Sequence, residues 1–150
     1  MSQLARKHLD KRFDRMRPLS DFARPPRGWL RAVREALEMT TAQFGRRLQV
    51  SQSRISALEK AEMNESVTLA SLRRAAEALD CTLVYALVPR QPLDATLMER
   101  ARAVAKKKLS RIDHTMRLEN QAIDVEELNS ERERLARELA EHPRRLWDDA

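Results

Sequence analysis

Three observations on the sequence predict a mainly α-helical fold. Glycine is scarce, with 2 among 150 residues, and aromatic residues make up 4%, whereas charged residues make up 35%. This composition is typical of helices and differs from a β-sandwich or barrel, which needs many turns. Apolar residues recur at three- and four-residue intervals, as on one face of an amphipathic helix. Only residues 82–88 have the β-branched and aromatic character of a strand.

The first predicted helix spans residues 3–17 and is strongly basic. Pro18, Pro25 and Pro26 prevent its continuation, so residues 18–27 are expected to form an extended linker. Residues 1–60 contain 14 Lys and Arg against 6 Asp and Glu, while the rest of the chain contains 15 against 17. This asymmetry suggests that the N-terminal 60 residues bind a polyanion, and the alternative is that a solvated helix carries the charge. The basic helix is expected to pack on a partner subunit, to lie along DNA phosphates, or to fray.

Four short helices are predicted between residues 28 and 80. The first runs from Trp29 to Met39, and its apolar stripe consists of Leu30, Val33 and Leu37. The other three each follow a hydroxyl-bearing residue that can cap a helix N-terminus, namely Thr40, Ser51 and Thr68. Gln43 stands three residues after Thr40, which is the spacing of a capping box.

The second and third of these helices have the parts of a helix-turn-helix. Their predicted shared core consists of Phe44, Val50, Ile55 and Leu58. Gly45 has no side chain, which lets the two helices approach closely, and the turn between them is short. In this motif the second helix is exposed and enters the major groove of DNA. The sequence therefore predicts a DNA reader.

The predicted DNA contacts follow from side-chain chemistry. Gln52 can form a bidentate contact to adenine, serine can serve several bases, and Ala57 can meet a thymine methyl group. Arginine and lysine near the helix ends suit phosphates. The residues expected to contact DNA are Thr41, Arg46, Arg47, Ser51, Gln52, Ser53, Arg54, Ser56, Ala57 and Lys60.

Residues 40–60 resemble the helix-turn-helix of the phage-repressor-like (Cro/C1, or XRE) family. The most specific piece is Val50-Ser-Gln-Ser-Arg-Ile-Ser-Ala-Leu-Glu59. The resemblance implies that Gln52, Ser53 and Ser56 touch bases. It also implies that Glu59 forms a structural ion pair with Arg34.

Two positions depart from the family pattern. Thr41 stands where the family usually has a glutamine that grips a phosphate. Gln49 replaces the usual glycine of the turn, so a residue with a side chain is expected to adopt positive φ there, with some strain.

The predicted strand at residues 82–88 has no other strand in the chain to pair with. Unpaired backbone groups are costly when buried and promote association when exposed. The simplest resolution is antiparallel pairing with the same strand of a second copy, which predicts a homodimer. The alternative is that the segment extends the core. The residues expected at the dimer contact are Leu83, Val84, Tyr85 and Leu87.

The last 60 residues are predicted to contain two further helices. The first spans residues 93–119, and its apolar stripe includes Leu97, Ala101, Val104 and Ile112. Asp124 with Glu127 signals the start of the second, whose inward residues include Val125 and Leu135 and which His142 and Pro143 end. A lone aromatic near the C-terminus, Trp147, is expected to dock into a pocket.

Thr115-Met-Arg-Leu-Glu119-Asn120 places Thr115 and Glu119 on one helix face, where a carboxylate would seek a cation on a binding partner. The segment resembles the [Ser/Thr]-x-x-x-Glu-[Gly/Asn] inhibition motif of antitoxins that silence Fic-domain enzymes. The whole chain resembles the mobile mystery protein A family, which accompanies a Fic-domain protein. The resemblance implies that Glu119 pairs with an active-site arginine of the toxin and blocks seating of the ATP γ-phosphate, so that AMP transfer stops. Thr115 and Asn120 would anchor the helix.

The sequence thus predicts a mainly α fold with a phage-repressor-like helix-turn-helix domain, one short β-strand pairing across a dimer, and a C-terminal helical extension. Residues 1–27 form the basic N-terminal helix and linker, residues 28–90 the DNA-binding domain with the dimerisation strand, and residues 91–150 the toxin-binding region. The predicted function is an antitoxin that represses its own operon and inhibits a Fic-domain toxin. The alternative is a stand-alone repressor whose C-terminal helices dimerise or sense a ligand.

The composition argues against an enzyme, a metal site and a membrane protein. Cys81 is the only cysteine and the three histidines are scattered, so no disulfide, metal or cofactor site is expected. There is no glycine-rich phosphate loop and no nucleophile with a base at telling spacing. No apolar run is long enough for a membrane span, and the N-terminus lacks the apolar region of a signal peptide. A cytoplasmic protein, nucleoid-associated when bound to DNA, is expected.

Overall fold

The computed structural model describes residues 3–118 and 124–148. Contacts divide the chain into two compact units. We call Arg17–Leu87 the helix-turn-helix unit, and Met1–Met16 together with Val88–Ala150 the hairpin unit. This division differs from the boundaries expected at residues 27 and 90, because the first helix groups with the C-terminal helices. No helix among the described residues is long and apolar enough to span a bilayer.

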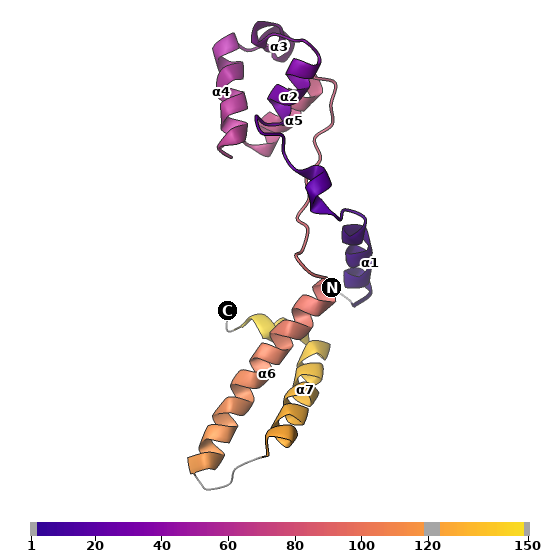
Figure 1. Cartoon of the computed structure of the whole chain (residues 1–150), viewed down its shortest axis with the longest axis vertical. Coiled ribbons are helices and arrows are strands. Elements are labelled where there is room, and N and C mark those ends of the chain that lie inside the picture. The colour runs from indigo at the N-terminus through magenta and orange to yellow at the C-terminus, as the bar shows by residue number, and fades with distance from the viewer. Residues whose placement is uncertain (1–2, 119–123, 149–150) are drawn as a thin grey trace. The chain divides into compact units, whose positions relative to one another are not determined.

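The helix-turn-helix unit contains a short 3-10 helix η1 (Leu19–Phe22) and four α-helices, α2 (Trp29–Ala36), α3 (Thr41–Leu48), α4 (Gln52–Met63) and α5 (Leu69–Ala78) (Figure 1). The helices α2–α5 surround one small core. Its buried members are Leu30, Phe44, Ile55, Ala75 and Leu79, and Phe44 and Ile55 are completely buried. Val50 and Leu58 pack partly buried against this core, so the predicted core of the motif is confirmed.

The helix starts of this unit follow the predicted caps. Thr40 accepts a hydrogen bond from the backbone N–H of Gln43 at 3.1 Å, while the Gln43 side chain accepts one from the backbone N–H of Thr40 at 2.8 Å. This reciprocal pair is the expected capping box. Ser51 and Thr68 likewise accept from the backbone N–H groups of Arg54 and Ser71. These caps fix where α3, α4 and α5 begin.

The helix ends of this unit are unusual because they do without glycine. Four residues with side chains adopt left-handed backbone there, at φ between 54° and 62°: Glu38, Gln49, Glu65 and Asp80. A residue with a Cβ atom is strained in this region. Gln49, at φ 61°, closes α3, so the predicted positive φ in the turn is confirmed. Positive φ at the other three positions was not predicted from the sequence.

The hairpin unit is built on two long helices, α6 (Leu93–Leu118) and α7 (Val125–Glu141), which run side by side in opposite directions (Figure 1). A short 3-10 helix, η2 (Pro143–Trp147), follows α7 and packs on both. The buried core of this unit consists of Ala101, Ala105, Ala136 and Leu146. Small alanines let α6 and α7 approach closely.

Two details of this unit differ from the sequence expectations. Helix α7 begins at Val125 as predicted, but the Asp124 side chain makes no capping hydrogen bond. The C-terminal residue that docks is Leu146, which is 1% exposed, whereas Trp147 is 48% exposed. The Trp147 ring lies instead beside the Arg100 guanidinium, 5.8 Å from the ring centre, and Arg100 also donates to the Leu146 carbonyl at 2.7 Å.

The basic N-terminal helix α1 (Gln3–Asp14) belongs to the hairpin unit. The Asp10 carboxylate accepts the backbone N–H of Leu93 at 2.7 Å and that of Asp94 at 3.5 Å, at the N-terminus of α6. Arg6 donates to the Asp94 carboxylate at 3.0 Å. Of the three sequence expectations for this helix, none named its docking on the chain's own C-terminal helices.

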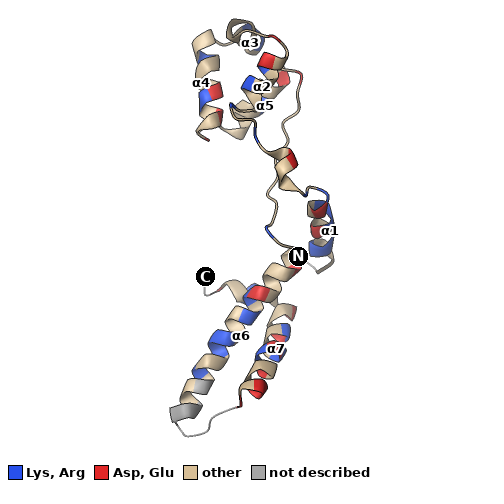
Figure 2. Cartoon of the chain, in the orientation of Figure 1, with Lys and Arg blue, Asp and Glu red and all other residues tan. Residues whose placement is uncertain are grey.

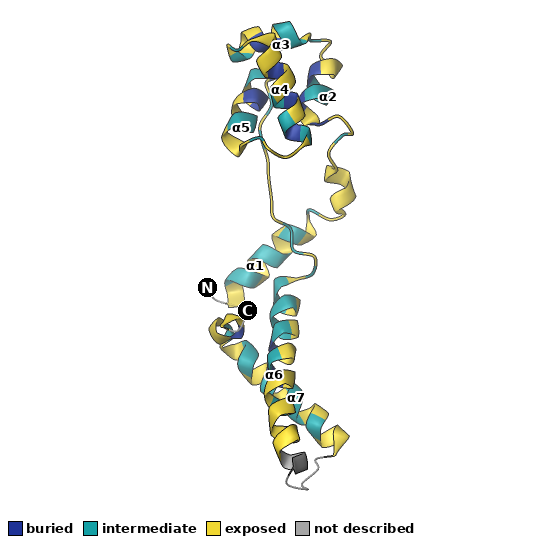
Figure 3. Ribbon diagram, turned by 90° about the vertical axis from the view of Figure 1, so that its left-hand side faces the viewer, coloured by how far each residue is buried: buried dark blue, intermediate teal, exposed yellow. Residues whose placement is uncertain are grey.

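The predicted strand and three side chains that were expected to face inward differ from the sequence expectations. Residues 82–88 have no regular secondary structure, and no strand occurs between residues 3 and 118 or between 124 and 148, so the strand is not confirmed. A lone chain offers that segment no ladder to join. Leu37, Ile112 and Val125 were expected to face inward but are 54%, 47% and 69% exposed. Figure 3, which is coloured by burial, shows that the last described turns of α6 are exposed. Leu37 directly follows α2 and Val125 is the first residue of α7, so both lie at helix ends.

Candidate nucleic-acid interface

Helix α4, the expected recognition helix, is tied to α2 by a buried ion pair. The Glu59 carboxylate accepts from Arg34 Nε at 2.5 Å and from Arg34 Nη2 at 3.2 Å, and both side chains are about 10% exposed or less. The Glu59 hydrogen bond raises the pKa of the Arg34 guanidinium. Arg34 also donates to the carbonyl of Met39, three residues after the end of α2. The ion pair implied by the family resemblance is therefore present.

A second carboxylate on α4, Glu62, holds the opposite end of α2. It accepts the backbone N–H groups of Trp29 at 2.7 Å and of Leu30 at 2.9 Å, and Glu62 itself is 6% exposed. The residue before α2 is Gly28, which has no side chain to cap the helix. Glu62 therefore caps α2 from a distance. With Glu59 it fixes α4 against both ends of α2.

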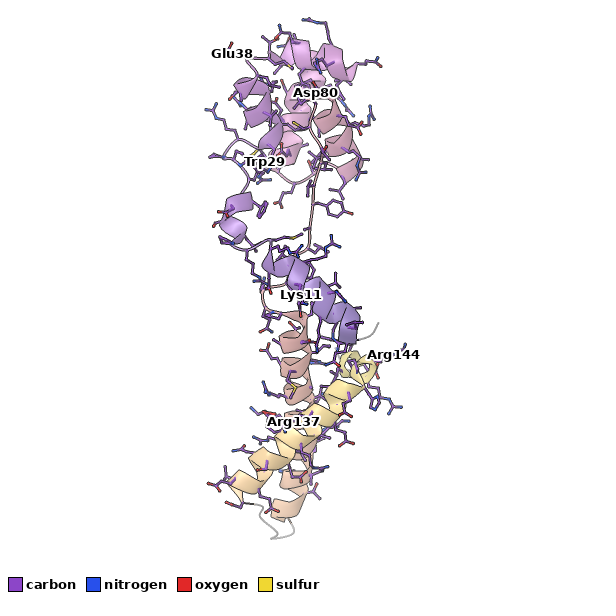
Figure 4. The ribbon with its side chains drawn as sticks, turned by 90° about the vertical axis from the view of Figure 1, so that its right-hand side faces the viewer. Lys11, Trp29, Glu38, Asp80, Arg137 and Arg144 are labelled. Atoms are coloured by element: carbon purple, nitrogen blue, oxygen red, sulfur yellow. The ribbon has the colours of Figure 1, made fainter. Side chains whose placement is uncertain are left out.

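Gly28 and Arg24 complete this contact. A Cβ atom on Gly28 would lie 2.9 Å from Glu62 Oε1, and its φ of 88° also favours glycine. Arg24 donates to the carbonyl of Glu62 at 2.9 Å, which satisfies a backbone group at the end of α4. Figure 4 labels Trp29 at the start of α2, where this contact forms. The sequence reasoning missed these residues, although a helix start without a capping side chain was a usable signal.

The turn between α3 and α4 depends on Gly45. A Cβ atom there would lie 2.7 Å from the Val50 carbonyl oxygen, which is closer than real Cβ atoms come. Gly45 is buried, and its carbonyl accepts the Val50 N–H at 2.9 Å. The close approach expected at this glycine is confirmed.

The face of α4 that points away from the core is polar and open. Gln52, Ser53, Ser56, Ala57 and Lys60 are all exposed, while Ile55, Glu59 and Glu62 are buried on the other side. Three serine hydroxyls make local contacts. Ser51 and Ser53 lie 3.1 Å apart, and Ser56 donates to the Gln52 carbonyl at 3.4 Å. Within residues 3–118 and 124–148 the side chains of Gln52 and Lys60 form no hydrogen bond or ion pair, so they can meet a ligand without breaking one.

The residues predicted to contact phosphates differ in exposure and in the hydrogen bonds they form. Arg46 and Arg54 are exposed, and Thr41 is partly buried at the first position of α3. Arg47 differs, because it donates to the Ala78 carbonyl at 2.6 Å and to the Asp80 carboxylate at 3.3 Å. Arg47 thus joins α3 to the end of α5. These interactions compete with any phosphate for its guanidinium.

The other predicted sites lie outside this interface. Val84, Tyr85 and Leu87 are 81%, 64% and 87% exposed, and Leu83 is partly buried. Thr115 is exposed near the end of α6 and donates to the Arg111 carbonyl at 3.0 Å. Glu119 and Asn120 lie outside the described residues.

Comparison with known proteins identifies the motif. Residues 30–85 match a family model described as helix-turn-helix. The match covers α2 from its second residue, α3 to α5, and the start of the segment that follows. No curated protein and no solved structure matched the chain.

Proposed function

We propose that the chain is an XRE-type DNA-binding transcriptional regulator that reads operator DNA through the exposed face of α4. The observation that carries the proposal is the open polar face of a helix fixed by Glu59 and Glu62, within the segment that matches the helix-turn-helix family. A recognition helix needs a rigid support, because bidentate base contacts tolerate little misplacement. The side chains that read bases in this proposal are Gln52, Ser53, Ser56 and Ala57.

The test is operator selectivity. A preferred duplex is selected from a randomised library with the wild-type protein, and its affinity is compared with that of single-base variants. Gln52→Ala should relax the preference at one position and lose about 1–3 kcal/mol of discrimination there. Gln43→Ala, in the capping box of α3, serves as the control for loss of a glutamine outside the reading face. An unchanged selectivity profile in Gln52→Ala contradicts the assignment.

The proposed regulator acts as a homodimer through residues 82–88. The support is the exposure of three large hydrophobic side chains within four residues, Val84, Tyr85 and Leu87. An extended apolar segment with unpaired backbone groups favours pairing with its own copy. Two copies related by a two-fold axis would also suit a palindromic operator.

The finer proposal is that the protein is the antitoxin of a Fic-domain toxin. It rests on the resemblance of Thr115-x-x-x-Glu119-Asn120 to the inhibition motif, and on a hairpin unit that DNA binding does not require. In this proposal the protein has no catalytic activity. Glu119 forms an ion pair with the active-site arginine of the toxin that otherwise positions the ATP γ-phosphate.

Co-expression with the product of the neighbouring gene tests this proposal. We expect a stable complex that transfers no AMP with the wild-type protein and that transfers AMP with Glu119→Gly. Glu126→Gly, on the exposed first turn of α7, is the matched control and should stay silent. If the neighbour is not a Fic protein, or if Glu119→Gly still silences it, the antitoxin role is wrong.

The alternative is a stand-alone repressor whose C-terminal helices sense a ligand. One feature of the hairpin unit favours it. A groove of about 1180 Å³ lies among α1, α6, α7 and η2, and its lining includes Arg6, Leu97, Leu139 and Trp147. Six of its lining residues are apolar and eight are polar or charged, which suits an amphipathic ligand that carries charge. A ligand that changes operator affinity without any partner protein would favour this reading.

A further inference from the structure

We propose that the exposed side of α1 is a second nucleic-acid surface, which binds DNA phosphates and adds to the affinity of the helix-turn-helix unit. We call this surface the basic face of α1, and it consists of Lys7, Lys11 and Arg12 on the helix and of Arg15, which directly follows it. It goes beyond base reading by α4, but it rests on the proposed function in that both surfaces act on the same duplex.

The charges of α1 are sorted between two sides. Arg6 and Asp10 are partly buried and engage the start of α6. The four residues of the basic face are exposed, and none of their side chains forms a hydrogen bond or ion pair within the described part of the chain. Asp14 is the one acidic residue exposed on this described helix. The docked side is neutralised, and the open side keeps its positive charge.

Helix stability explains only part of this pattern. Lys11 and Arg12 lie in the last turn, where cations favour the helix dipole. Lys7 lies a turn or more earlier and Arg15 lies beyond the helix, so neither has that role. Four unpaired cations within nine residues repel one another, and a polyanion relieves this repulsion.

The helix is also held in place. Asp10 caps α6, and the Arg6–Asp94 ion pair is partly buried, with 17% of the arginine side chain exposed. A preformed, anchored helix presents its cations without the entropy cost of ordering a free tail. Figure 2 shows the blue segments of α1, and Figure 4 labels Lys11.

The partner that fits this surface is a DNA backbone. The face offers four positive charges within nine residues and no exposed Phe, Tyr or Trp among the described residues of α1, which suits phosphate contacts without sequence reading. Residues 15–28 connect α1 to α2, and 14 residues span at most about 50 Å, so α1 stays tethered to the unit that contains α4. Once α4 binds an operator, flanking phosphates are therefore at high effective concentration.

The salt dependence of binding tests the proposal. The affinity of the full-length protein is measured between 50 and 300 mM NaCl for the selected duplex and for a random duplex of equal length. The variant Lys7→Gln/Lys11→Gln/Arg12→Gln/Arg15→Gln removes the basic face but leaves Arg6 and Asp10, and glutamine is as good a helix former as lysine. Each lost phosphate contact should lower the slope of log K against log[salt] by about 0.9, so we expect a decrease of roughly 2 to 4 on both duplexes.

A matched variant removes the same number of cations elsewhere on the hairpin unit. Lys106→Gln/Lys107→Gln/Lys108→Gln/Arg111→Gln changes four exposed residues of α6, and should leave the slope nearly unchanged. Equal slopes for the α1 variant and wild type, or an equal fall with the α6 variant, overturn the proposal. If the wild-type protein binds the selected and the random duplex equally well, operator reading by α4 is refuted instead. The α1 variant does not change α4, so the two failures are distinguishable.

Discussion

The carboxylate of Glu62 on α4 accepts the backbone N–H of Trp29, the first residue of α2, at 2.7 Å. The two residues are 33 positions apart, so this helix cap is a tertiary contact. It makes the start of α2 and the C-terminal turn of α4 depend on each other. Stability and DNA binding of the unit should therefore respond together to this residue.

Glu62→Ala removes the cap and leaves the N–H groups of Trp29 and Leu30 without an acceptor, one of them buried. We expect a loss of about 1–3 kcal/mol in the free energy of unfolding of the helix-turn-helix unit. Urea unfolding followed by Trp29 fluorescence measures it in a Trp147→Phe background, because each unit has one tryptophan. Glu62→Gln, which keeps one acceptor oxygen, should lose less. Glu77→Ala, at an exposed residue of α5, should lose almost nothing, and an equal loss there would contradict the assignment.

Gly45→Ala should destabilise the same unit. The new Cβ atom would lie 2.7 Å from the Val50 carbonyl oxygen, and backbone cannot move away as a flexible side chain can. The expected cost is about 1–3 kcal/mol in the same fluorescence experiment. Operator affinity should fall as well, because relief of the clash tilts α4. A variant as stable as wild type would mean that the turn between α3 and α4 is looser than described.

Gln49→Gly should have the opposite effect. Gln49 adopts φ 61°, where a residue with a side chain is destabilised by about 1–2 kcal/mol. Glycine removes this strain, but it also loses more conformational entropy on folding, which cancels part of the stabilisation. We expect a net stabilisation of up to about 1 kcal/mol. Gln52→Gly makes the same substitution at the first position of α4 and should destabilise. If both variants destabilise, the turn is not strained at Gln49.

Val84→Lys with Leu87→Lys should convert the proposed dimer into a monomer. Both side chains are more than 80% exposed in the single chain, so the substitutions cost the isolated fold little. Charges placed in a paired apolar strand would repel their symmetry mates. Light scattering after size-exclusion chromatography measures the mass. Leu69→Lys, at a leucine that is 45% exposed on α5, is the control and should leave the mass unchanged.

The features that were predictable from the sequence are those set by neighbouring residues. Thr40, Ser51 and Thr68 each cap a helix through a backbone N–H three residues later, so their role is visible in the local pattern. The positive φ of Gln49 and the small core around Phe44 likewise follow from a short motif. The ion pair of Arg34 and Glu59 came from the family resemblance alone.

The features that were missed depend on contacts between distant residues. Glu62 and Asp10 are typical surface charges in sequence, yet each caps a helix that begins far away in the chain. Arg47 had the character of a phosphate contact, but its partners at the end of α5 are 31 and 33 residues away. Periodicity gives the inward face of a helix but not how far its neighbour extends, and this explains the exposed Leu37 and Val125.

The hairpin unit is discontinuous, which matters for how the protein is made. Asp10 leaves the ribosome 83 residues before Leu93, whose backbone N–H it accepts. At typical rates of synthesis α1 waits about 4–17 s for that partner, while all of residues 17–87 emerge and can fold. The helix-turn-helix unit can thus fold first, whereas α1 gains its contact with α6 only when residues near 93 have been made. Cleavage of the first 16 residues would leave the N-terminus of α6 uncapped and the helix-turn-helix unit whole.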